Sequence, residues 1–441
     1  MDGRRQYDAP GLGLLGPEYK AVPLAAWGRT AEDFIAAAPG LADLPTPLLT
    51  LDAGAITQNV ETMASWARSV GVDLAPHGKT TMAPALWRQQ IEAGALGLSV
   101  ATGWQLMIAL AHDVPWVQMA YPLLDPALIR HLAANPPAQR VLSWVDGVDV
   151  VESMAAALAG QQVVRPLEVL VELGAPGGRT GARSLDQAVE VARAVVAAPG
   201  LRLAGVAGYE GALAHHADTE SLAVVRKYLN ELARLQARLG AEGLYQEVPG
   251  GLVLTAGGSA FFDVVADVLA PLHDPEGRSG PAVRVVVRAG AYIAHDDGFY
   301  RDITPMAGAG GGPGARSDGQ LRAALHGWVR VLSRPEPGLA LVDAGKRDLP
   351  FDEGLPEVQA IRRGGTGATE PLAGATVSAM NDQHTFVRLD PEAGHVAVGD
   401  VLRLGISHPC TAFDKWRLLP VLDDTHAAQP VLVDWVRTVF G

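Results

Sequence analysis

The sequence is poor in lysine and cysteine and has no long apolar run. Among its 441 residues are five lysines and one cysteine, Cys410. A single cysteine excludes an internal disulfide and fits a reducing compartment. No stretch reaches about 18 uninterrupted apolar residues, so we expect no membrane span. The first residues also lack the apolar core of a signal peptide, and a cytoplasmic location is expected.

Positive charge is scarce as well. Lysine and arginine number 35 against 48 acidic residues, which gives a net charge of −13. This balance argues against a nucleic-acid backbone as partner. A hydrophobic content of 48% with 19% charged residues is typical of a well-packed globular protein. The length exceeds one ordinary core, so two domains are expected.

Apolar periodicity predicts alternating helices and strands. Residues 52–71 have helical spacing, and Asp52 is a suitable N-cap. After this helix, short apolar runs alternate with helix-like stretches. Eight runs are predicted strands: 74–79, 96–102, 117–122, 140–146, 168–174, 203–211, 252–258 and 283–292.

Most of these runs are apolar throughout, which is typical of parallel strands buried on both faces. Eight such units in sequence favour a closed (β/α)8 TIM-type barrel, placed at residues 46–302. A doubly wound open sheet is the alternative, which periodicity alone does not exclude. The fold class is α/β in either case.

The pattern changes beyond the barrel. Residues 307–320 are glycine-rich without a period, and we interpret them as a mobile loop and not as a phosphate cradle. A mostly antiparallel β-domain is predicted over 303–441. The early strand 47–52 would pair with it, so residues 1–45 would associate with it too. The β-like runs are 325–334, 339–345, 384–389 and 399–407.

Several reactive side chains follow the predicted barrel strands. Side chains at the C-terminal strand ends of such a barrel converge on one mouth. Lys79 ends the first strand, where partial desolvation would depress its pKa and make the amine a nucleophile. Its natural electrophile is the aldehyde of pyridoxal phosphate, and a solvated loop lysine is the alternative. The other candidates are Arg179, Tyr209, Gly257, Gly258, Ser259 and Tyr292.

His408 and Cys410 stand two positions apart at the end of an apolar strand. In an extended chain both side chains point to one face. An imidazole and a thiolate there make half of a zinc site, and water or substrate would complete a catalytic shell. A buried thiol beside a hydrogen-bonded histidine is the alternative.

Five motifs occur together and in order. They are Pro-His-Gly-Lys-Thr (76–80), Arg-Thr-Gly (179–181), Tyr-Glu-Gly (209–211), Gly-Gly-Ser (257–259) and Ser-His-Pro-Cys (407–410). The set resembles the D-serine dehydratase and D-threonine aldolase family of pyridoxal phosphate enzymes, and within it the bacterial branch called amino-acid deaminases. The resemblance implies the alanine racemase fold, a (β/α)8 barrel followed by a β-domain. It also implies a homodimer in which the β-domain of one chain closes the barrel mouth of the other.

The resemblance implies a role for each matched residue. Lys79 would hold the cofactor and move the substrate α-proton. Arg179 would face the pyridine nitrogen, and Tyr209 would lie near the ring oxygen. The phosphate would be bound by the Gly-Gly-Ser motif, and zinc by His408 and Cys410.

The implied activity is a pyridoxal phosphate- and zinc-dependent dehydratase that converts D-β-hydroxy amino acids such as D-serine or D-threonine to 2-oxo acids and ammonia. Aldolase members carry an aspartate in place of Cys410 and use a harder ion, so Cys410 favours zinc and β-elimination. An aldolase and a non-catalytic pyridoxal phosphate-binding protein are the alternatives. A role of His384 near the metal stays open, and His215 and His216 are interpreted as a solvated pair.

Overall fold

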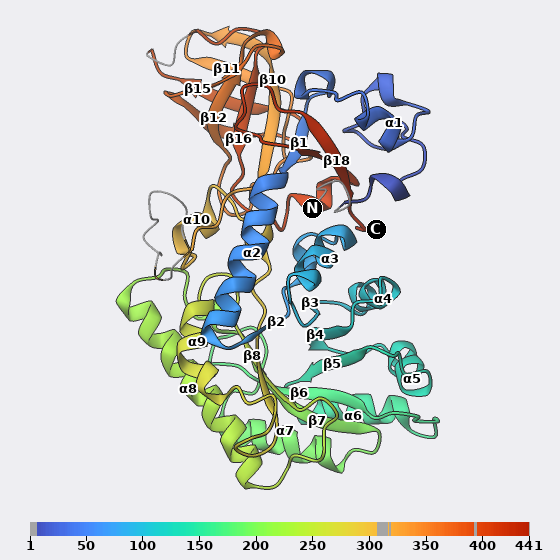
Figure 1. Ribbon diagram of the computed structural model, residues 1–441. Helices are drawn as coiled ribbons and strands as arrows, with labels where there is room; N and C mark the ends of the chain where they lie inside the picture. The colour runs from blue at the N-terminus through green and yellow to red at the C-terminus, as the bar shows by residue number, and fades with distance from the viewer. Residues whose placement is uncertain (1–6, 307–315, 317–318, 392–394, 441) are drawn as a thin grey trace.

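The computed structural model describes residues 7–306, 316, 319–391 and 395–440. A barrel domain and a β-domain lie one above the other, joined by α2 (Ala53–Val70) and by the chain before β10 (Figure 1). Most of the glycine-rich stretch 307–320 falls outside the described residues.

The first domain is an eight-stranded parallel barrel. The strands follow the order β2-β9-β8-β7-β6-β5-β4-β3, and their apolar side chains fill the interior. The predicted barrel is thereby confirmed. The strands are β2 (Asp73–Leu74), β3 (Leu98–Val100), β4 (Trp116–Pro122), β5 (Arg140–Val145), β6 (Leu167–Leu173), β7 (Leu201–Gly208), β8 (Leu252–Ala256) and β9 (Val283–Val287).

A few hydrogen bonds close the barrel between β2 and β3. The Leu96 amide donates to the Leu74 carbonyl at 2.7 Å, and the Ser99 amide donates to the Pro76 carbonyl at 2.9 Å. His77 also forms a parallel bridge with Ser99. The sheet therefore returns on itself, and the open doubly wound alternative is wrong.

Helices surround the barrel strands, as Figure 1 shows. The predicted first helix is confirmed as α2, and the Asp52 carboxylate caps it by accepting from the Ala55 amide at 2.7 Å. The remaining helices are α1 (Ala31–Ile35), α3 (Pro84–Glu92), α4 (Gly103–Ala111), α5 (Pro126–Ala134), α6 (Val148–Leu158), α7 (Leu185–Ala197), α8 (Thr219–Ala241), α9 (Phe262–Leu269) and α10 (Phe299–Ile303).

The second domain is a ten-stranded, mostly antiparallel sheet. Its member from the start of the chain, β1 (Leu48–Asp52), pairs antiparallel with β10 and parallel with β17. The early apolar run therefore belongs to this sheet and leads directly into α2. The other strands are β10 (Leu325–Glu336), β11 (Leu339–Val342), β12 (Glu357–Arg362), β13 (Thr369–Pro371), β14 (Ala375–Met380), β15 (Thr385–Leu389), β16 (Val401–Gly405), β17 (Leu418–Leu422) and β18 (Leu432–Arg437).

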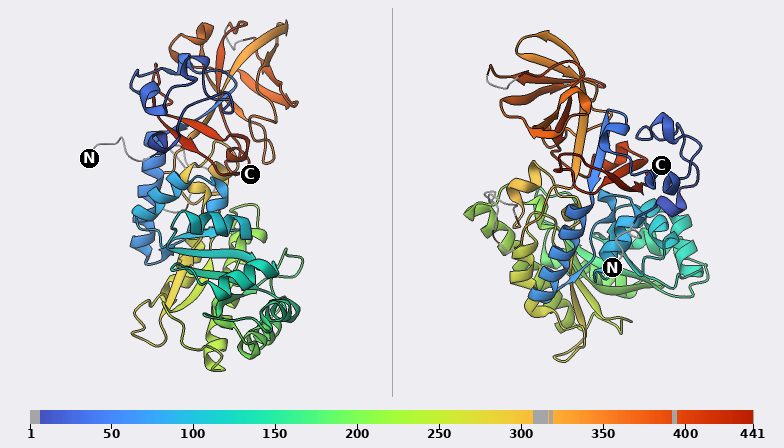
Figure 2. Two further views of the ribbon diagram at one scale, coloured as in Figure 1. Left: turned by 90° about the vertical axis from the view of Figure 1, so that its right-hand side faces the viewer. Right: turned by 45° about the horizontal axis from the view of Figure 1, so that its top comes forward.

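The segment before β1 lies against the end of the chain, beside the β-domain (Figure 2). The Asp8 amide donates to the Trp435 carbonyl at 3.0 Å, and the Leu41 amide donates to the Pro430 carbonyl at 2.9 Å. Within the described ranges, none of the helices combines the length and the apolar character that crossing a membrane requires.

Two barrel strands are shorter than their apolar runs suggest. The run 74–79 contributes only Leu74 to the two-residue strand β2, and the run 283–292 ends as strand at Val287. The residues beyond each strand form loops at the barrel mouth. These loops carry the reactive side chains.

Candidate active site

Lys79 lies just past β2, in the short 3-10 helix η4 (Gly78–Thr80). The chain before it is held against β9, because the His77 amide donates to the Arg288 carbonyl at 3.1 Å. A Cβ on Gly290 would lie 2.6 Å from the His77 carbonyl oxygen, so this close approach requires glycine. The position of Lys79 at the mouth is thus fixed by backbone contacts between the first and last barrel strands.

The surroundings of Lys79 favour its neutral amine. Burial is the largest cause of its lowered pKa, and the positive charges of Arg179 and Arg288 lower that pKa further. Cys410 acts in the opposite direction. Part of the Lys79 side chain is nevertheless exposed to solvent at the barrel mouth. A reactant in the mouth could therefore reach an amine of raised nucleophilicity.

Arg288 is a buried guanidinium that sequence reasoning missed. It is 4% exposed, donates to Thr255 Oγ1 at 2.8 Å and donates to the Gly208 carbonyl at 2.6 Å. Its guanidinium carbon lies 4.9 Å from the centre of the Trp144 ring. Arg288 directly follows β9 but lies inside the predicted run 283–292, so the sequence did not mark it as a strand-end residue. It places a fixed positive charge beside the mouth.

The glycine amides expected to bind phosphate have another partner. Glu210 is completely buried, and its carboxylate accepts from the Gly257 amide at 2.9 Å and from the Gly258 amide at 2.7 Å. The structure therefore assigns these two amides to an internal carboxylate. The Tyr-Glu-Gly motif contains this glutamate. Its partner Gly257 lies 47 positions further along the chain, so no local sequence pattern predicts the contact.

Ser259 lies at a better anion site. Its hydroxyl oxygen accepts from the amides of Gly290 and Ala291, at 3.3 Å and 3.1 Å. A hydroxyl and two backbone amides thus meet between the loops that follow β8 and β9. The two amides already donate to the Ser259 oxygen, so the Ser259 hydroxyl hydrogen is the donor that this site can offer an anion such as phosphate.

Two of the predicted aromatic and cationic residues meet at the mouth, and one does not. The guanidinium carbon of Arg179 lies 5.2 Å from the centre of the Tyr209 ring. Burial, followed by the charge of Glu210, raises the pKa of Tyr209. Tyr292 instead packs in the core, 3% exposed, with its hydroxyl bonded to Gln90. The structure therefore places Tyr292 in the core beside the mouth, and its contact with a cofactor stays a prediction.

The β-domain brings His408 and Cys410 to the barrel mouth. Cys410 Sγ lies 3.2 Å from Oγ1 of Thr80, the residue after Lys79. Nδ1 of His408 lies 2.7 Å from Asp352 Oδ2. Burial alone would lower the pKa of His408, but hydrogen bonds and charge from Cys410 and Asp352 raise it to about 9. All of these contacts lie within one chain.

The other histidines raised by the sequence lie elsewhere. His384 is exposed in a β-domain turn, where its carbonyl accepts from the Asn381 amide at 2.8 Å. His215 and His216 are exposed and line a cavity of about 930 Å³ between the barrel and the β-domain, which Ser407 also lines. Neither position places an imidazole beside Lys79.

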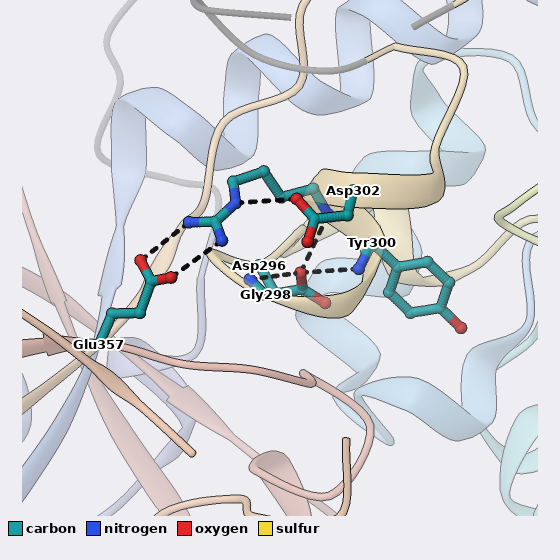
Figure 3. A network of polar contacts seen from close by, with 6 residues as sticks. Asp296, Gly298, Tyr300, Asp302 and Glu357 are labelled. Carbon is teal, nitrogen blue, oxygen red and sulfur yellow. Dashed lines mark hydrogen bonds and ion pairs between the residues drawn. The ribbon is translucent and has the colours of Figure 1, made fainter. Parts of the chain in front are cut away.

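A buried carboxylate, that of Asp296, holds the backbone of the segment that carries Tyr300 (Figure 3). Asp296 is 1% exposed, and its Oδ1 accepts from the amides of Gly298, Tyr300 and Arg301 at 3.0, 2.9 and 3.2 Å. The Tyr300 ring centre lies 5.9 Å from that of His408. Tyr300 follows no strand directly, so no sequence pattern marked it as a candidate.

Asp296 predicts a pH-dependent stability. Burial raises its pKa from 3.8 to about 7, although backbone N–H bonds oppose the shift. Because the pKa rises on folding, the stability Asp296 contributes is full below about pH 4 and is lost as pH rises through about 7. We expect Asp296→Asn to remove this loss. Between about pH 4 and 8, the free energy of unfolding should fall by on the order of 2 kcal/mol more in the wild type than in the variant.

Urea unfolding of both proteins, free of metal and cofactor, measures this difference. An identical pH dependence in the two proteins would show that Asp296 titrates near its ordinary pKa.

Comparisons with known proteins match both domains. Residues 324–422 match the family described as "Putative serine dehydratase domain". The chain is 28% identical over 397 residues to a D-threonine aldolase from an Arthrobacter species, covering 88% of this chain and 92% of that protein. It is 29% identical over 335 residues to a 3-hydroxy-D-aspartate aldolase from Paracoccus denitrificans (strain Pd 1222), covering 74% and 78%.

Solved structures share the whole architecture. A D-threonine aldolase from Filomicrobium marinum superposes with a TM-score of 0.71 at 25% identity, covering 90% of this chain and 97% of that one. A D-threo-3-hydroxyaspartate dehydratase with a cysteine replaced by alanine, in the metal-free form, gives 0.70 at 20% identity, covering 91% and 100%. The same enzyme with the histidine two positions earlier replaced gives 0.72 at 21%, covering 93% and 99%.

The chain is similar in sequence and fold to this group of proteins, and the cofactor that the resemblance implies is pyridoxal phosphate. The residues at its mouth fit this cofactor. Lys79 supplies an amine for the cofactor aldehyde, and the Ser259 hydroxyl, held by the Gly290 and Ala291 amides, can donate to the phosphate. Arg288 places a permanent cation beside Lys79.

The donor set of the β-domain fits a borderline-soft metal ion. His408 and Cys410 offer an imidazole and a thiol, which suit zinc better than a hard ion. Asp352 holds the second ring nitrogen of His408, as carboxylates do behind metal-bound histidines. Within the described ranges no group of three or more His, Cys, Asp or Glu side chains could hold a metal. A metal at this pair would therefore have open coordination positions.

Proposed function

We propose that the protein is a pyridoxal phosphate-dependent lyase acting on D-3-hydroxy amino acids. The observation that carries the proposal is the 3.2 Å approach of Cys410 Sγ to Thr80 Oγ1, because it sets a histidine–cysteine pair beside Lys79. The names of the curated relatives support the substrate class. A non-catalytic binding protein would not need this pair.

The chain's own residues divide the work. When bound, pyridoxal phosphate supplies an electron sink for charge at the substrate α-carbon. Lys79, with its lowered pKa, can take the α-proton at Nζ. Arg288 lies buried nearby and cannot accept a proton at neutral pH. If Arg288 faced the pyridine nitrogen of the cofactor, that nitrogen would stay unprotonated. The sequence resemblance implies this role for Arg179.

His408 and Cys410 would hold a zinc ion, which lowers the basicity of a hydroxyl bound to it. Thr80 orients the thiol from the barrel side, and Asp352 orients the imidazole from the β-domain side. Tyr300 closes the space beside His408 and limits access of water there.

Two reactions are open to such a site. Cleavage of the Cα–Cβ bond would give glycine and an aldehyde, and loss of the β-hydroxyl would give a 2-oxo acid and ammonia. The names of the curated relatives support cleavage, the alternative reaction in the sequence analysis, better than elimination. Cys410 favours elimination, since one of the similar solved structures is a dehydratase that also has a histidine and a cysteine two positions apart.

Product analysis with D-threonine tests the proposal. On the Cys410 argument we expect 2-oxobutanoate and ammonia from the purified protein supplied with cofactor and zinc. Glycine and acetaldehyde would keep the lyase and replace elimination by the aldolase reaction. No turnover of D-threonine, D-serine or 3-hydroxy-D-aspartate, with L-threonine as the stereochemical control, would contradict the proposed function.

The homodimer also remains a proposal. An apolar groove of about 530 Å³ lies at the barrel mouth, between α4 and the loop after β4. The side chains of Trp104, Met107, Tyr121 and Leu124 are exposed there. A second copy that covered this groove would bury them.

A further inference from the structure

Glu172 is a buried carboxyl for which the mechanism above has no use. It lies near the C-terminal end of β6 and is 4% exposed. Oε1 accepts from Thr180 Oγ1 at 2.9 Å. Oε2 is buried and has no hydrogen-bond partner among the described residues. A buried carboxylate oxygen without a donor is costly, so it calls for a partner.

Arg179 directly precedes Thr180, the residue whose hydroxyl donates to Glu172, and it is therefore a candidate partner for Glu172 Oε2. Glu172, Arg179 and Thr180 line one small cavity of about 20 Å³, together with Tyr209 and Tyr228. This volume accommodates about one water molecule. The Arg179 side chain is exposed, and its guanidinium carbon lies 5.2 Å from the centre of the Tyr209 ring, so it lies at the rim of the cavity that Glu172 also lines.

The loop carrying Arg179 is fixed on its C-terminal side. Thr180 bonds Glu172, and the Gly181 amide donates to Asp146 Oδ2 at 3.0 Å. Arg179 precedes these two anchors, so its long side chain can turn between the rim and the cavity while its backbone stays in place.

The charges around Glu172 suit a guanidinium. Burial is the main cause that raises its pKa to about 7, and Asp146 raises it further. The Thr180 hydroxyl and the charges of Arg288 and Arg179 lower it. Tyr228 also faces the carboxyl from α8. A second donor would complete the carboxylate and favour its ionised form.

We propose that Glu172 is a positioning residue for Arg179. Its Oε2 holds the guanidinium inside the mouth, directly or through one water in the small cavity. The role rests on the proposed function, because the placement of Arg179 matters for catalysis only if the mouth binds the anionic cofactor. Arg179 then acts as a held cation at the mouth, and Glu172 acts through it.

Arginine modification of the cofactor-free, full-length protein tests this. We expect phenylglyoxal to modify Arg179, mapped by mass spectrometry, roughly three- to tenfold faster in Glu172→Gln than in the wild type at pH 8. Glu168→Gln is the matched control: Glu168 lies on the same strand, where its Oε2 accepts from Arg140 Nε at 2.8 Å. Equal rates in the wild type and Glu172→Gln would overturn the proposal, as would an equal acceleration in Glu168→Gln.

A wild-type measurement covers the case in which Glu172→Gln fails to fold. The modification rate of Arg179, relative to that of N-acetylarginine, should fall as pH rises through about 7 and Glu172 ionises. A constant ratio from pH 6 to pH 8.5 would overturn the proposal. In loaded protein, Glu172→Gln should also weaken cofactor binding several-fold, with Glu168→Gln unchanged. The modification rate is measured without cofactor and does not depend on turnover. A negative result would therefore overturn the Glu172–Arg179 contact without bearing on the proposed lyase activity.

Discussion

Lys79→Ala loses lyase activity by roughly 10³-fold or more, together with the near-visible absorption band of the lysine-bound cofactor. The loss is this large because one amine both holds the cofactor and moves the α-proton. Its lowered pKa and its place between β2 and β9 make Lys79 the lysine suited to both tasks. Absorption spectra and initial rates with D-threonine measure the effect.

Lys227→Ala is the matched control, since Lys227 is exposed on α8, which lies outside the barrel. It should keep both the band and the activity. If Lys79→Ala kept the absorption band, the cofactor would be attached to another lysine, and the site described above would be the wrong one.

Cys410→Ala should retain the cofactor band, lose stoichiometric zinc and lower turnover about 10²-fold or more. The thiol lies at the boundary between the β-domain and the barrel, where it is 3.2 Å from Thr80 Oγ1 and also hydrogen-bonds to His408. Removing it leaves one imidazole, which is too few protein ligands to hold a catalytic zinc. Metal analysis after dialysis, together with absorption spectra, separates the two effects.

Two further variants sharpen this test. His384→Ala removes an exposed β-domain histidine and should leave zinc unchanged. Cys410→Asp keeps a ligand but exchanges a soft donor for a hard one, so it should shift the metal preference from zinc towards manganese or magnesium. Full zinc occupancy in Cys410→Ala would place the metal site elsewhere.

The barrel was predictable because its strands are apolar on both faces and regularly spaced. The strand limits were not, since β2 has only two residues and its run continues as a loop to Lys79. Apolar composition reports burial, and loops at a barrel mouth are buried as strands are. The same ambiguity explains Tyr292, which follows a strand run but packs in the core.

Side-chain partners distant in sequence set the limits for the site. The approach of Cys410 to Thr80 joins residues 330 positions apart, and the contact of Glu210 with the Gly257 amide spans 47. Single residue types gave the candidates, but only the fold shows that Glu210 already occupies two amides. Arg288 was missed for a different reason. It lies inside the predicted run 283–292, and only the structure shows that the strand ends just before it, at Val287.

Reductive trapping identifies the lysine that binds pyridoxal phosphate, which we propose is Lys79. Borohydride reduces the carbon–nitrogen double bond between a lysine and pyridoxal phosphate, and peptide mapping then identifies the modified lysine. With only five lysines in the chain, the assignment is unambiguous. We expect one reduced pyridoxal phosphate per chain, attached to Lys79. A label on Lys20, Lys227, Lys346 or Lys415, or no label at all, would contradict it.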